Sequence, residues 1–370
     1  MKSKITTVLF CGFLSVMCLF LVLVPGKSFS EKEKRYLEEP PRLTVKSLLS
    51  GEFGEKAENY AADHLPMRDL LIGLSADLDR LMLRQTTKEI YIGADDRLFE
   101  RPAVCDPEDI AEKLEVINAF ASETGRSIGF GLVPSAGYML ENSIGGLADS
   151  YADGEIISLA YSLAGEGVYP IDIVSAFETQ PDPGALYYRT DHHWTSLGAF
   201  TAANVLLERF GKTPLNAELF TVESVPGFYG TTYSRSALWR FSGEELELWH
   251  AEGDFTVTNS DDDLPHKGLF YTEYLSDADK YPVFLGGNHP IIRIENSDPC
   301  AEGSILLIRD SYSSSIAPFL AQAYKTVVLA DLRYYKYPLS QLLEDESFDS
   351  VIVLYSVGNF TSDTNLLLLE

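Results

Sequence analysis

The chain has 370 residues, of which 45% are hydrophobic and 12% aromatic, a composition typical of a folded protein with a large core and not of a disordered chain. Its formal net charge is −26, and its lysine and arginine residues form no basic stripe, which argues against a nucleic-acid-binding protein. The acidic balance is typical of a solubilising surface.

An uncharged apolar segment lies close to the N-terminus. Ile5 to Val24, ITTVLFCGFLSVMCLFLVLV, is twenty residues long, and at about 1.5 Å per residue a helix of this length crosses the roughly 30 Å hydrocarbon core of a bilayer. No A-x-A-like cleavage site follows, so a retained anchor within residues 1–26 is favoured over a cleaved signal peptide. The positive-inside rule alone would keep the bulk of the chain cytoplasmic. Two basic residues precede the segment and four follow it closely: Lys2 and Lys4, then Lys27, Lys32, Lys34 and Arg35.

The four cysteines divide by location. Cys11 and Cys18 lie in the apolar segment, whereas Cys105 and Cys300 belong to the remainder of the chain. An exported domain could join the latter pair in a disulfide. No C-x-x-C spacing occurs, so structural zinc is not expected.

Residues 27–87 are predicted to form a linker and a helical stalk. The linker, SFSEKEKRYLEEPPRLT (Ser28 to Thr44), is charged and contains prolines. An amphipathic helical pattern follows from Val45 to about Leu83, and Pro66 is expected to break or kink it.

Helices and short apolar strands alternate in residues 88–370. KEIYIGADDRLFER (Lys88 to Arg101) has apolar residues alternating around the turn Gly93 to Asp96, which predicts a hairpin. A helix is expected to begin after Asp106, an N-cap residue followed by a proline, and to end at Gly125.

The strongest fold signal is a strand–helix alternation near the C-terminus. Its segments are SILLIRDSY (Ser304 to Tyr312), SSSIAPFLAQAY, KTVVLADLRYY, PLSQLLEDE and FDSVIVLYSV. With the earlier strands Ser127 to Ser135 and Val168 to Val174, this pattern predicts an α/β domain with right-handed crossovers and a parallel sheet flanked by helices. Residues 212 to about 298 are expected to form a β-rich insertion with hairpins such as ELELWHAEGDFTVTN.

Ser311 stands where an apolar strand ends and a helix begins, in LLIRDSYSSS. This position would expose its hydroxyl at the carboxyl edge of the sheet, next to outward-pointing amides that could hold an oxyanion. The alternative is an ordinary helix-capping serine, a role that Ser313, Ser314 or Ser315 could equally fill.

A carboxylate and two histidines lie just before another predicted helix, in TDHHWTSLGAF (Thr190 to Phe200). Thr195 can cap the helix Ser196 to Phe210, and on an extended segment Asp191 and His193 face one side while His192 faces the other. A carboxylate can orient an imidazole that takes a proton from a serine hydroxyl. Asp191, His193 and Ser311 are therefore candidates for a catalytic triad.

Two alternatives remain open for these histidines. Asp191, His192 and His193 could ligate a metal, although adjacent side chains diverge and no H-x-x-x-H spacing accompanies them. They could also be core histidines bonded to backbone groups. We predict no metal and no cofactor.

TDHHWTSLGAF matches the signature of the DHHW protein family, which resembles the alginate O-acetyltransferase proteins with an SGNH-hydrolase-like fold. Those proteins carry a D-x-H-W motif, matched here by Asp191 and His193, and later a serine in a G-T-S-Y-S-like turn, matched by RDSYS with Ser311 as the nucleophile. EIYIGADDRLF, FYGTTYSRS, YPVFLGGNHP and LADLRYY resemble further blocks of the family.

The resemblance implies a circularly permuted order, in which Asp and His precede Ser, reversed relative to ordinary SGNH hydrolases. The sequence departs from the alginate-type motif at Asp310, where that motif has a small polar residue. A carboxylate beside the nucleophile would oppose anion formation by like-charge repulsion.

Four further residues are candidates for oxyanion or substrate binding. The Tyr312 amide and Asn288 in GGNHP are oxyanion candidates, although GGN can equally be only a tight turn. Arg333, after the next strand, could bind an acidic sugar or pair with acidic side chains. Trp194 could stack on a sugar ring or belong to the core.

The sequence therefore predicts a membrane-anchored, extracytoplasmic SGNH-like domain that transfers or removes an O-acyl group on an exported glycan. Export follows from the resemblance and from the single anchor, and a multispanning membrane acyltransferase would be the partner that supplies the acyl group. The rival interpretations are a non-catalytic glycan-binding or assembly protein on the same fold and a metal-dependent hydrolase.

Overall fold

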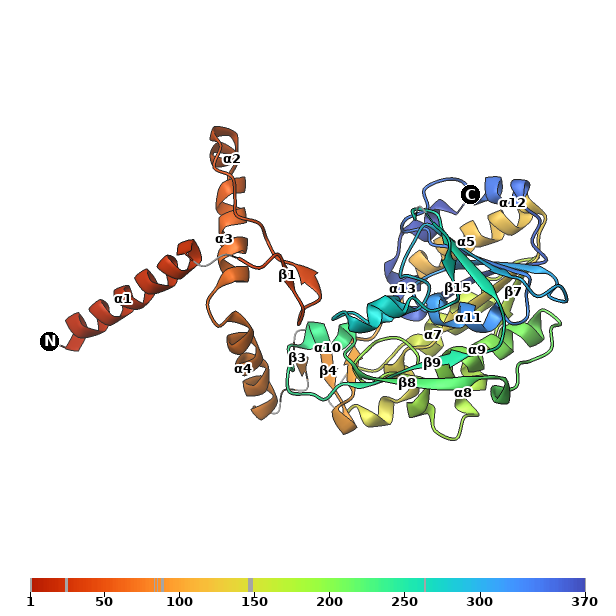
Figure 1. Ribbon diagram of the computed structural model, residues 1–370, viewed down its shortest axis with the longest axis horizontal. Coiled ribbons are helices and arrows are strands. Elements are labelled where there is room, and N and C mark those ends of the chain that lie inside the picture. Colours follow the sequence, from red (N-terminus) through yellow and green to blue (C-terminus); the bar gives the residue numbers. More distant parts are fainter. Residues whose placement is uncertain are drawn as a thin grey trace. The chain divides into compact units, whose positions relative to one another are not determined.

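The computed structural model describes residues 2–23, 26–82, 84, 86–87, 90–145, 149–262 and 264–369. Val24, Leu83 and Lys88, which bound predicted segments, lie outside these residues. The chain forms two compact units, one of residues 1–88 and 233–241 and the other of residues 89–232 and 242–370. Figure 1 labels their elements.

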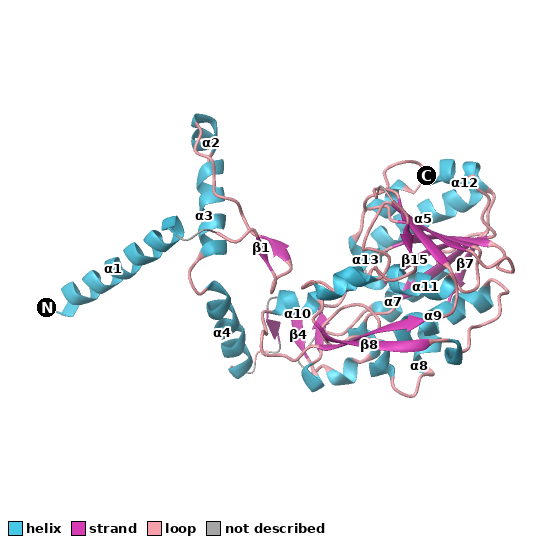
Figure 2. Cartoon of the chain, in the orientation of Figure 1, coloured by secondary structure: helices cyan, strands magenta, loops and turns pink. Residues whose placement is uncertain are grey.

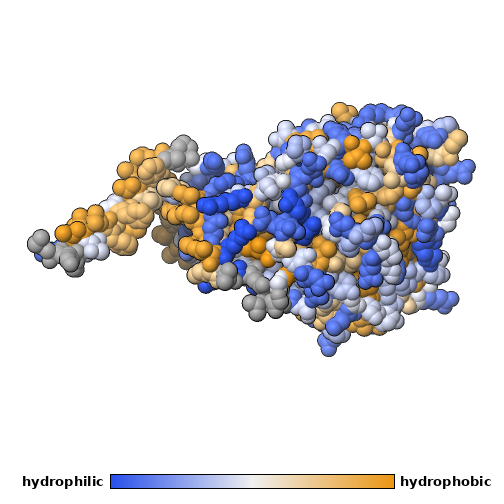
Figure 3. Space-filling view, turned by 90° about the horizontal axis from the view of Figure 1, so that it is seen from below, coloured by the Kyte–Doolittle hydropathy of each residue, from blue (hydrophilic) through white to orange (hydrophobic). Residues whose placement is uncertain are grey.

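The first unit begins with an apolar helix, α1 (Lys2–Leu23). Its window Lys4–Leu21 has a mean hydropathy of 2.0 and no buried share, so by length and composition it can cross a membrane. In the space-filling view its surface is mostly hydrophobic, whereas the visible face of the second unit is mixed (Figure 3). A signal sequence has the same properties.

The other described residues of the first unit form helices and three short strands. The predicted helical stretch is divided into α2 (Val45–Ser50), α3 (Glu52–His64) and α4 (Arg68–Leu81), and the last break lies at Pro66, as predicted. Arg35 donates to the Asp63 carboxylate, which holds the pKa of Asp63 at about 2. The strands are β1 (Phe29–Ser30), β2 (Arg35–Tyr36) and β3 (Thr86–Thr87).

An eight-stranded sheet forms the centre of the second unit, in the order β11-β10-β12-β14-β13-β15-β6-β7. The strands β14, β13, β15, β6 and β7 are parallel, whereas β10 pairs antiparallel with β11 and β12, and β12 with β14. The prediction of a parallel sheet was therefore wrong for one side of a mixed sheet. These strands are β6 (Ile128–Val133), β7 (Val168–Ile171), β10 (Phe255–Asn259), β11 (His266–Lys267), β12 (Ile291–Asn296), β13 (Ser304–Arg309), β14 (Thr326–Ala330) and β15 (Ser350–Ser356).

Helices cover both faces of this sheet, as Figure 2 shows. Successive residues of β13 alternate between two buried clusters: Leu306 packs with α5, α7, α12 and α13, whereas Leu307 packs with α8, α9 and α11. This alternation follows from the period of two in a strand. The helices are α5 (Pro107–Thr124), α6 (Ala136–Met139), α7 (Asp153–Ser162), α8 (Ile173–Glu178), α9 (Ser196–Arg209), α10 (Thr231–Ser236), α11 (Ser313–Leu320), α12 (Leu339–Asp345) and α13 (Val357–Ser362).

Local signals placed several elements correctly. Asp106 caps α5 through the amides of Glu108 and Asp109, and Gly125 ends this helix with φ of 62°. The hairpin around residues 93–96 is confirmed by the antiparallel pairing of β4 (Ile90–Ile92) with β5 (Leu98–Glu100).

The hairpin predicted in ELELWHAEGDFTVTN does not form. Its first half is β9 (Glu244–His250), which pairs with β8 (Thr221–Phe228), while its second half is β10, which joins the central sheet through β11 and β12. The alternation of apolar residues identified both strands, but it carries no information about which strand each one meets.

Candidate active site

Ser311 lies in the turn between β13 and α11, at the carboxyl end of a central parallel strand. The apolar strand Ser304–Arg309 is buried from Ile305 to Arg309, and Ser311 is only partly buried. The chain therefore leaves the core at this residue, which lies at the carboxyl edge of the sheet.

His193 lies next to this hydroxyl. Its Nε2 atom is 2.8 Å from Ser311 Oγ, although the two residues are 118 positions apart in the chain. Its Nδ1 atom is 2.5 Å from Asp191 Oδ1, and the same carboxylate oxygen accepts the backbone N–H of His193 at 2.9 Å. This network assigns the ring proton to Nδ1, which donates to Asp191, and leaves Nε2 to accept the Ser311 proton.

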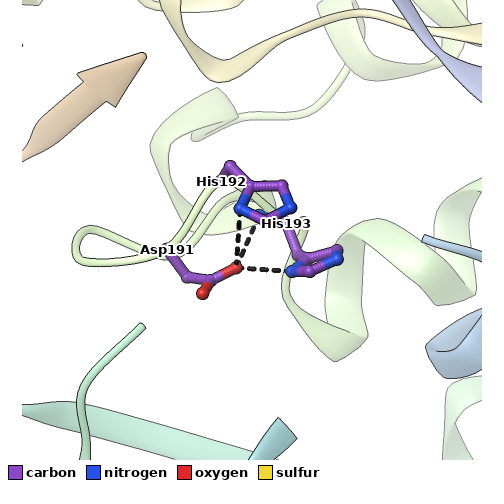
Figure 4. A group of neighbouring side chains, drawn as sticks. All are labelled: Asp191, His192 and His193. Atoms are coloured by element: carbon purple, nitrogen blue, oxygen red, sulfur yellow. Dashed lines mark hydrogen bonds and ion pairs between the residues drawn. The ribbon is translucent and has the colours of Figure 1, made fainter. Parts of the chain in front are cut away.

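His192 does not point away from this pair, so that part of the prediction was wrong. Its ring centroid is 3.9 Å from that of His193, and its Nδ1 lies 3.7 Å from Asp191 Oδ1. Figure 4 shows both imidazoles beside the same carboxylate oxygen. Residues 189–193 follow a series of bends and not an extended strand, so neighbouring side chains share a side.

Two other segments fix this loop. Glu244 of β9 accepts both the N–H and the hydroxyl of Thr190, at 2.7 and 2.5 Å. Thr231, the first residue of α10, donates its amide to Asp191 Oδ2 at 2.7 Å and contacts His192 Nδ1 through its hydroxyl at 2.6 Å. Both carboxylate oxygens of Asp191 are thus occupied.

Both carboxylate oxygens of Asp310 accept hydrogen bonds. Its Oδ2 accepts the amide and hydroxyl of Ser356 and the side-chain amide of Asn359, all at 2.7–2.8 Å. Its Oδ1 accepts the Tyr312 amide at 3.0 Å. The carboxylate therefore joins the β13–α11 turn to the end of β15. The Tyr312 amide donates to the same carboxylate within the turn.

Trp194 is fully buried, and its indole N–H donates to Ser315 Oγ at 2.8 Å. Its ring meets the buried ring of Tyr312 edge-on, at 5.3 Å. The residue therefore joins the histidine loop, residues 189–193, to the first turn of α11 and has no ring face open for a sugar.

Asn288 and Arg333 each form a hydrogen bond with a charged side chain. The amide oxygen of Asn288 accepts from Arg309 Nη1 at 2.8 Å, and Gly286 and Gly287 before it have φ of 82° and 105°, which explains both glycines. Arg333 donates to Asp331 at 2.9 and 2.6 Å. In the part of the chain that the structure describes, neither residue forms a hydrogen bond with Ser311.

Burial and neighbouring charges determine the protonation states of Asp191 and His193. Burial alone would raise the pKa of Asp191, but the charges of His193 and His192 and the hydrogen bonds from His193 hold it well below its ordinary value. Burial, and then the charge of His192, lower the pKa of His193 against the attraction of Asp191. An ionised carboxylate therefore faces a neutral imidazole, which is the form that can accept a proton.

Sequence reasoning missed three residues around His193: Glu244, Thr231 and Tyr281. Tyr281 stacks on the His193 ring with centroids 4.0 Å apart and an interplanar angle of 12°. Thr231 lies in FYGTTYSRS and Tyr281 opens YPVFLGGNHP, two blocks that resemble the family, but neither residue was given a role. Nothing in the sequence around Glu244 indicated more than a place in a strand.

Asp191, His192 and His193 also form one of two described clusters whose ligand atoms lie within 4.8 Å of one another; the other is Asp261, Asp262 and His289. In the first cluster the oxygen Asp191 Oδ1 already accepts two hydrogen bonds from His193. A metal ion bound through His193 Nδ1 would have to displace that contact.

Part of the chain matches the model of a known protein family. The model of the DHHW protein family matches residues 156–330, which contain both the histidine loop and Ser311. The resemblance to this family is confirmed.

Similar sequences include proteins named as probable alginate O-acetylases. The chain is 25% identical over 181 residues to AlgJ of Pseudomonas syringae pv. tomato, covering 46% of either chain. It is 22% identical over 187 residues to AlgJ of Pseudomonas putida, covering 48% of this chain and 49% of the relative. The chain thus matches about half the length of these relatives.

Two solved structures share the fold. A DHHW family protein from Eubacterium siraeum superimposes with a TM-score of 0.65 at 21% identity, over 76% of this chain and 95% of that chain. PatB1 from Bacillus cereus, solved with a sulfonyl adduct, gives 0.64 at 22% identity, over 76% and 98%. The α/β architecture is common to all three.

Gly230, which precedes Thr231, tests how closely the chain packs around Asp191. A Cβ atom at this position would lie 2.2 Å from Asp191 Cβ and 2.3 Å from its Oδ2. We expect Gly230→Ala to lower the free energy of unfolding by about 1–3 kcal/mol, because the loop must shift to admit the methyl group. Urea unfolding of the chain in detergent measures this difference.

The matched control for this substitution is Gly54→Ala in α3, where an added Cβ meets nothing within 4 Å. Gly54→Ala should slightly raise the free energy of unfolding, because alanine favours a helix more than glycine does. Equal stability of the two variants would contradict a closely packed Asp191.

Proposed function

We propose that the chain is an O-acyltransferase or esterase that uses Ser311 as nucleophile, His193 as base and Asp191 as the group that orients the base. The observation that carries this proposal is the chain of contacts from Asp191 Oδ1 through His193 to Ser311 Oγ, at 2.5 and 2.8 Å. The likeness to probable alginate O-acetylases supports an acyl group, such as acetyl, as the group transferred.

In the proposed reaction Ser311 Oγ attacks the carbonyl carbon of an O-acyl donor while its proton passes to His193 Nε2. The tetrahedral intermediate expels the donor's alkoxide oxygen, which takes that proton and leaves an acyl-serine. A sugar hydroxyl or water then attacks the acyl-serine, and its proton passes through the same nitrogen back to Ser311 Oγ. Asp191 stays ionised throughout and stabilises the transient imidazolium.

The oxyanion requires hydrogen-bond donors close to Ser311. Asn288 remains our proposed side-chain donor. Arg309 donates to its amide oxygen at 2.8 Å, and this contact orients the amide so that its NH₂ group points away from Arg309. The Tyr312 amide, predicted for this role, donates to Asp310 instead, so its use would require that contact to lengthen. One donor in such a site lowers the barrier by about 3 kcal/mol.

We propose an exported glycan as the acyl acceptor or substrate, because the relatives are named for alginate. The apolar helix α1 would anchor the chain in a membrane with the second unit outside. A cytoplasmic acyl group would then have to be passed across the membrane by a multispanning acyltransferase. Arg333, held by Asp331, remains a proposed contact for an acidic sugar.

We further propose that the order Asp191, His193, Ser311 reflects a circular permutation of an SGNH-like arrangement. In support, the histidine loop precedes α9, whereas the serine follows the later strand β13 of the same sheet. The non-catalytic alternative, a glycan-binding or assembly protein on this fold, would leave these contacts in place without turnover, and the experiment below separates the two.

Ester hydrolysis tests the proposed nucleophile and base. The chain in detergent should release acetate from an activated acetyl ester, and Ser311→Ala and His193→Ala should each reduce kcat/KM by about 10³-fold or more. The measurement is initial-rate kinetics for the wild type and both variants. EDTA should leave the rate unchanged, since no step uses a metal.

The control is Ser162→Ala, which removes an exposed serine of the same unit whose hydroxyl donates to Leu159 O at the end of α7. Its activity should match the wild type. Hydrolysis that survives Ser311→Ala would contradict the assignment, and so would a rate that EDTA abolishes. Absence of hydrolysis and of transfer in a folded chain would favour the non-catalytic alternative.

The pH dependence tests the electrostatics of His193. Because burial and His192 lower the pKa of the His193 imidazole, kcat/KM should rise with pH through a midpoint below 6.5, the ordinary histidine value. His192→Gln removes the repelling charge, so the midpoint should move to higher pH. An acid limb that stays in place in His192→Gln would show that His192 does not influence the base.

A further inference from the structure

The His193 imidazole lies between two other rings. Tyr281 stacks on it almost in parallel, with centroids 4.0 Å apart and planes 12° apart. His192 approaches at 3.9 Å with a plane tilted by 35°. The base is therefore restrained by ring contacts as well as by its two hydrogen bonds.

Tyr281 is itself fixed at both ends. Its backbone begins the 3₁₀ turn Tyr281–Val283, and its hydroxyl donates to Ser315 Oγ at 3.2 Å. The same Ser315 oxygen accepts the Trp194 indole at 2.8 Å. The ring of Tyr281 is thus tied to α11 and, through Trp194, to the loop that carries His193.

In the proposed reaction, proton transfer from Ser311 converts the buried His193 into an imidazolium. The positive charge is opposed by burial and by a charged His192, and it is attracted by Asp191. The titratable groups that face His193, from its own loop and from the packed elements, are Asp191, His192, Asp310, Tyr281 and Tyr312.

An aromatic face attracts a cation placed over it, because the ring quadrupole is negative above and below the plane. Burial raises the pKa of Tyr281, so its ring remains a neutral phenol. A neutral imidazole gains little from this contact, whereas an imidazolium gains more. The interaction is therefore stronger during proton transfer than before it, which is the condition for accelerating the reaction.

We propose that Tyr281 is a positioning residue that holds the His193 ring by stacking and stabilises its protonated form through its aromatic face. The proposal rests on the proposed function for its catalytic consequence, but the stacking contact and its effect on His193 do not. It assigns a role to the tyrosine of the YPVFLGGNHP block.

The test is titration of His193 by NMR in ¹⁵N-histidine-labelled chain, with His193→Gln used to assign the signal. Tyr281→Phe keeps the aromatic face and should leave the pKa of His193 close to its wild-type value. Tyr281→Leu removes the face and should lower this pKa by about 0.5–1.5 pH units. In ester hydrolysis, the acid limb of kcat/KM should shift in the same direction, and kcat should fall by about tenfold while KM changes little.

A graded series covers the case in which Tyr281→Leu does not fold. Phenylalanine with one, two or three ring fluorines at position 281 keeps the shape of the ring and weakens its quadrupole in steps. The pKa of His193 should fall with each added fluorine. A flat series, or a pKa unchanged in folded Tyr281→Leu, overturns the proposal.

A second variant separates the hydroxyl from the ring. Ser315→Ala removes the acceptor of the Tyr281 hydroxyl, and it should change the pKa of His193 less than Tyr281→Leu does. Failure of the proposed function would appear differently: the NMR shift would persist while hydrolysis did not depend on Ser311.

Discussion

One hydrogen bond, between Ser311 Oγ and His193 Nε2 at 2.8 Å, joins two segments that are 118 residues apart. It can form only if the carboxyl end of β13 and the loop before α9 meet at one edge of the sheet. Most of the polar contacts described around it serve this meeting. Asp310 ties the serine turn to β15, while Glu244 and Thr231 fix the loop that carries Asp191 and His193.

The surroundings of this bond also set its electrostatics. Asp191 and His193 are 2% and 4% exposed, and burial of charged groups is costly unless they are paired. Each oxygen of Asp191 accepts hydrogen bonds, so the carboxylate can stay ionised away from water. The imidazole stays neutral at rest and can become charged only beside Asp191 and the face of Tyr281.

His192 and Asp191 therefore have opposite effects on the pKa of His193. His192 opposes a positive charge on His193, which keeps its ring available as a proton acceptor, and Asp191 favours the same charge once the proton arrives. A base that is neutral at rest and stabilised when charged is suited to taking a proton from a hydroxyl and returning it to a leaving group. The geometry thus fits acyl transfer, in which His193 first takes a proton from a hydroxyl and then gives it to the leaving group.

Local patterns in the sequence predicted a large part of the fold. The cap at Asp106, the cap at Thr195 and the hairpin turn at residues 93–96 depend on neighbouring residues, and all three were predicted. The partners of β9 and β10 depend on strands far along the chain, and the prediction there was wrong. The mixed sheet was missed for the same reason.

The candidate site likewise contains residues that the sequence predicted and residues that it did not. Asp191, His193 and Ser311 were brought together by a motif and a resemblance, since spacing alone left metal binding and core packing open. The position of His192 was missed because the loop bends, and Tyr281, Thr231 and Glu244 reach the site through tertiary contacts that no local pattern encodes. Trp194 matched the motif, yet full burial gives it a structural role.

The most direct measurement is mapping of a sulfonyl fluoride adduct by peptide mass spectrometry, because this reagent modifies an activated serine in preference to an ordinary one. The account predicts a single adduct on Ser311 in the folded chain, at a rate that falls sharply in His193→Ala. An adduct on Ser313, Ser314 or Ser315 in place of Ser311, or labelling of Ser311 that is unaffected by the loss of His193, would contradict it.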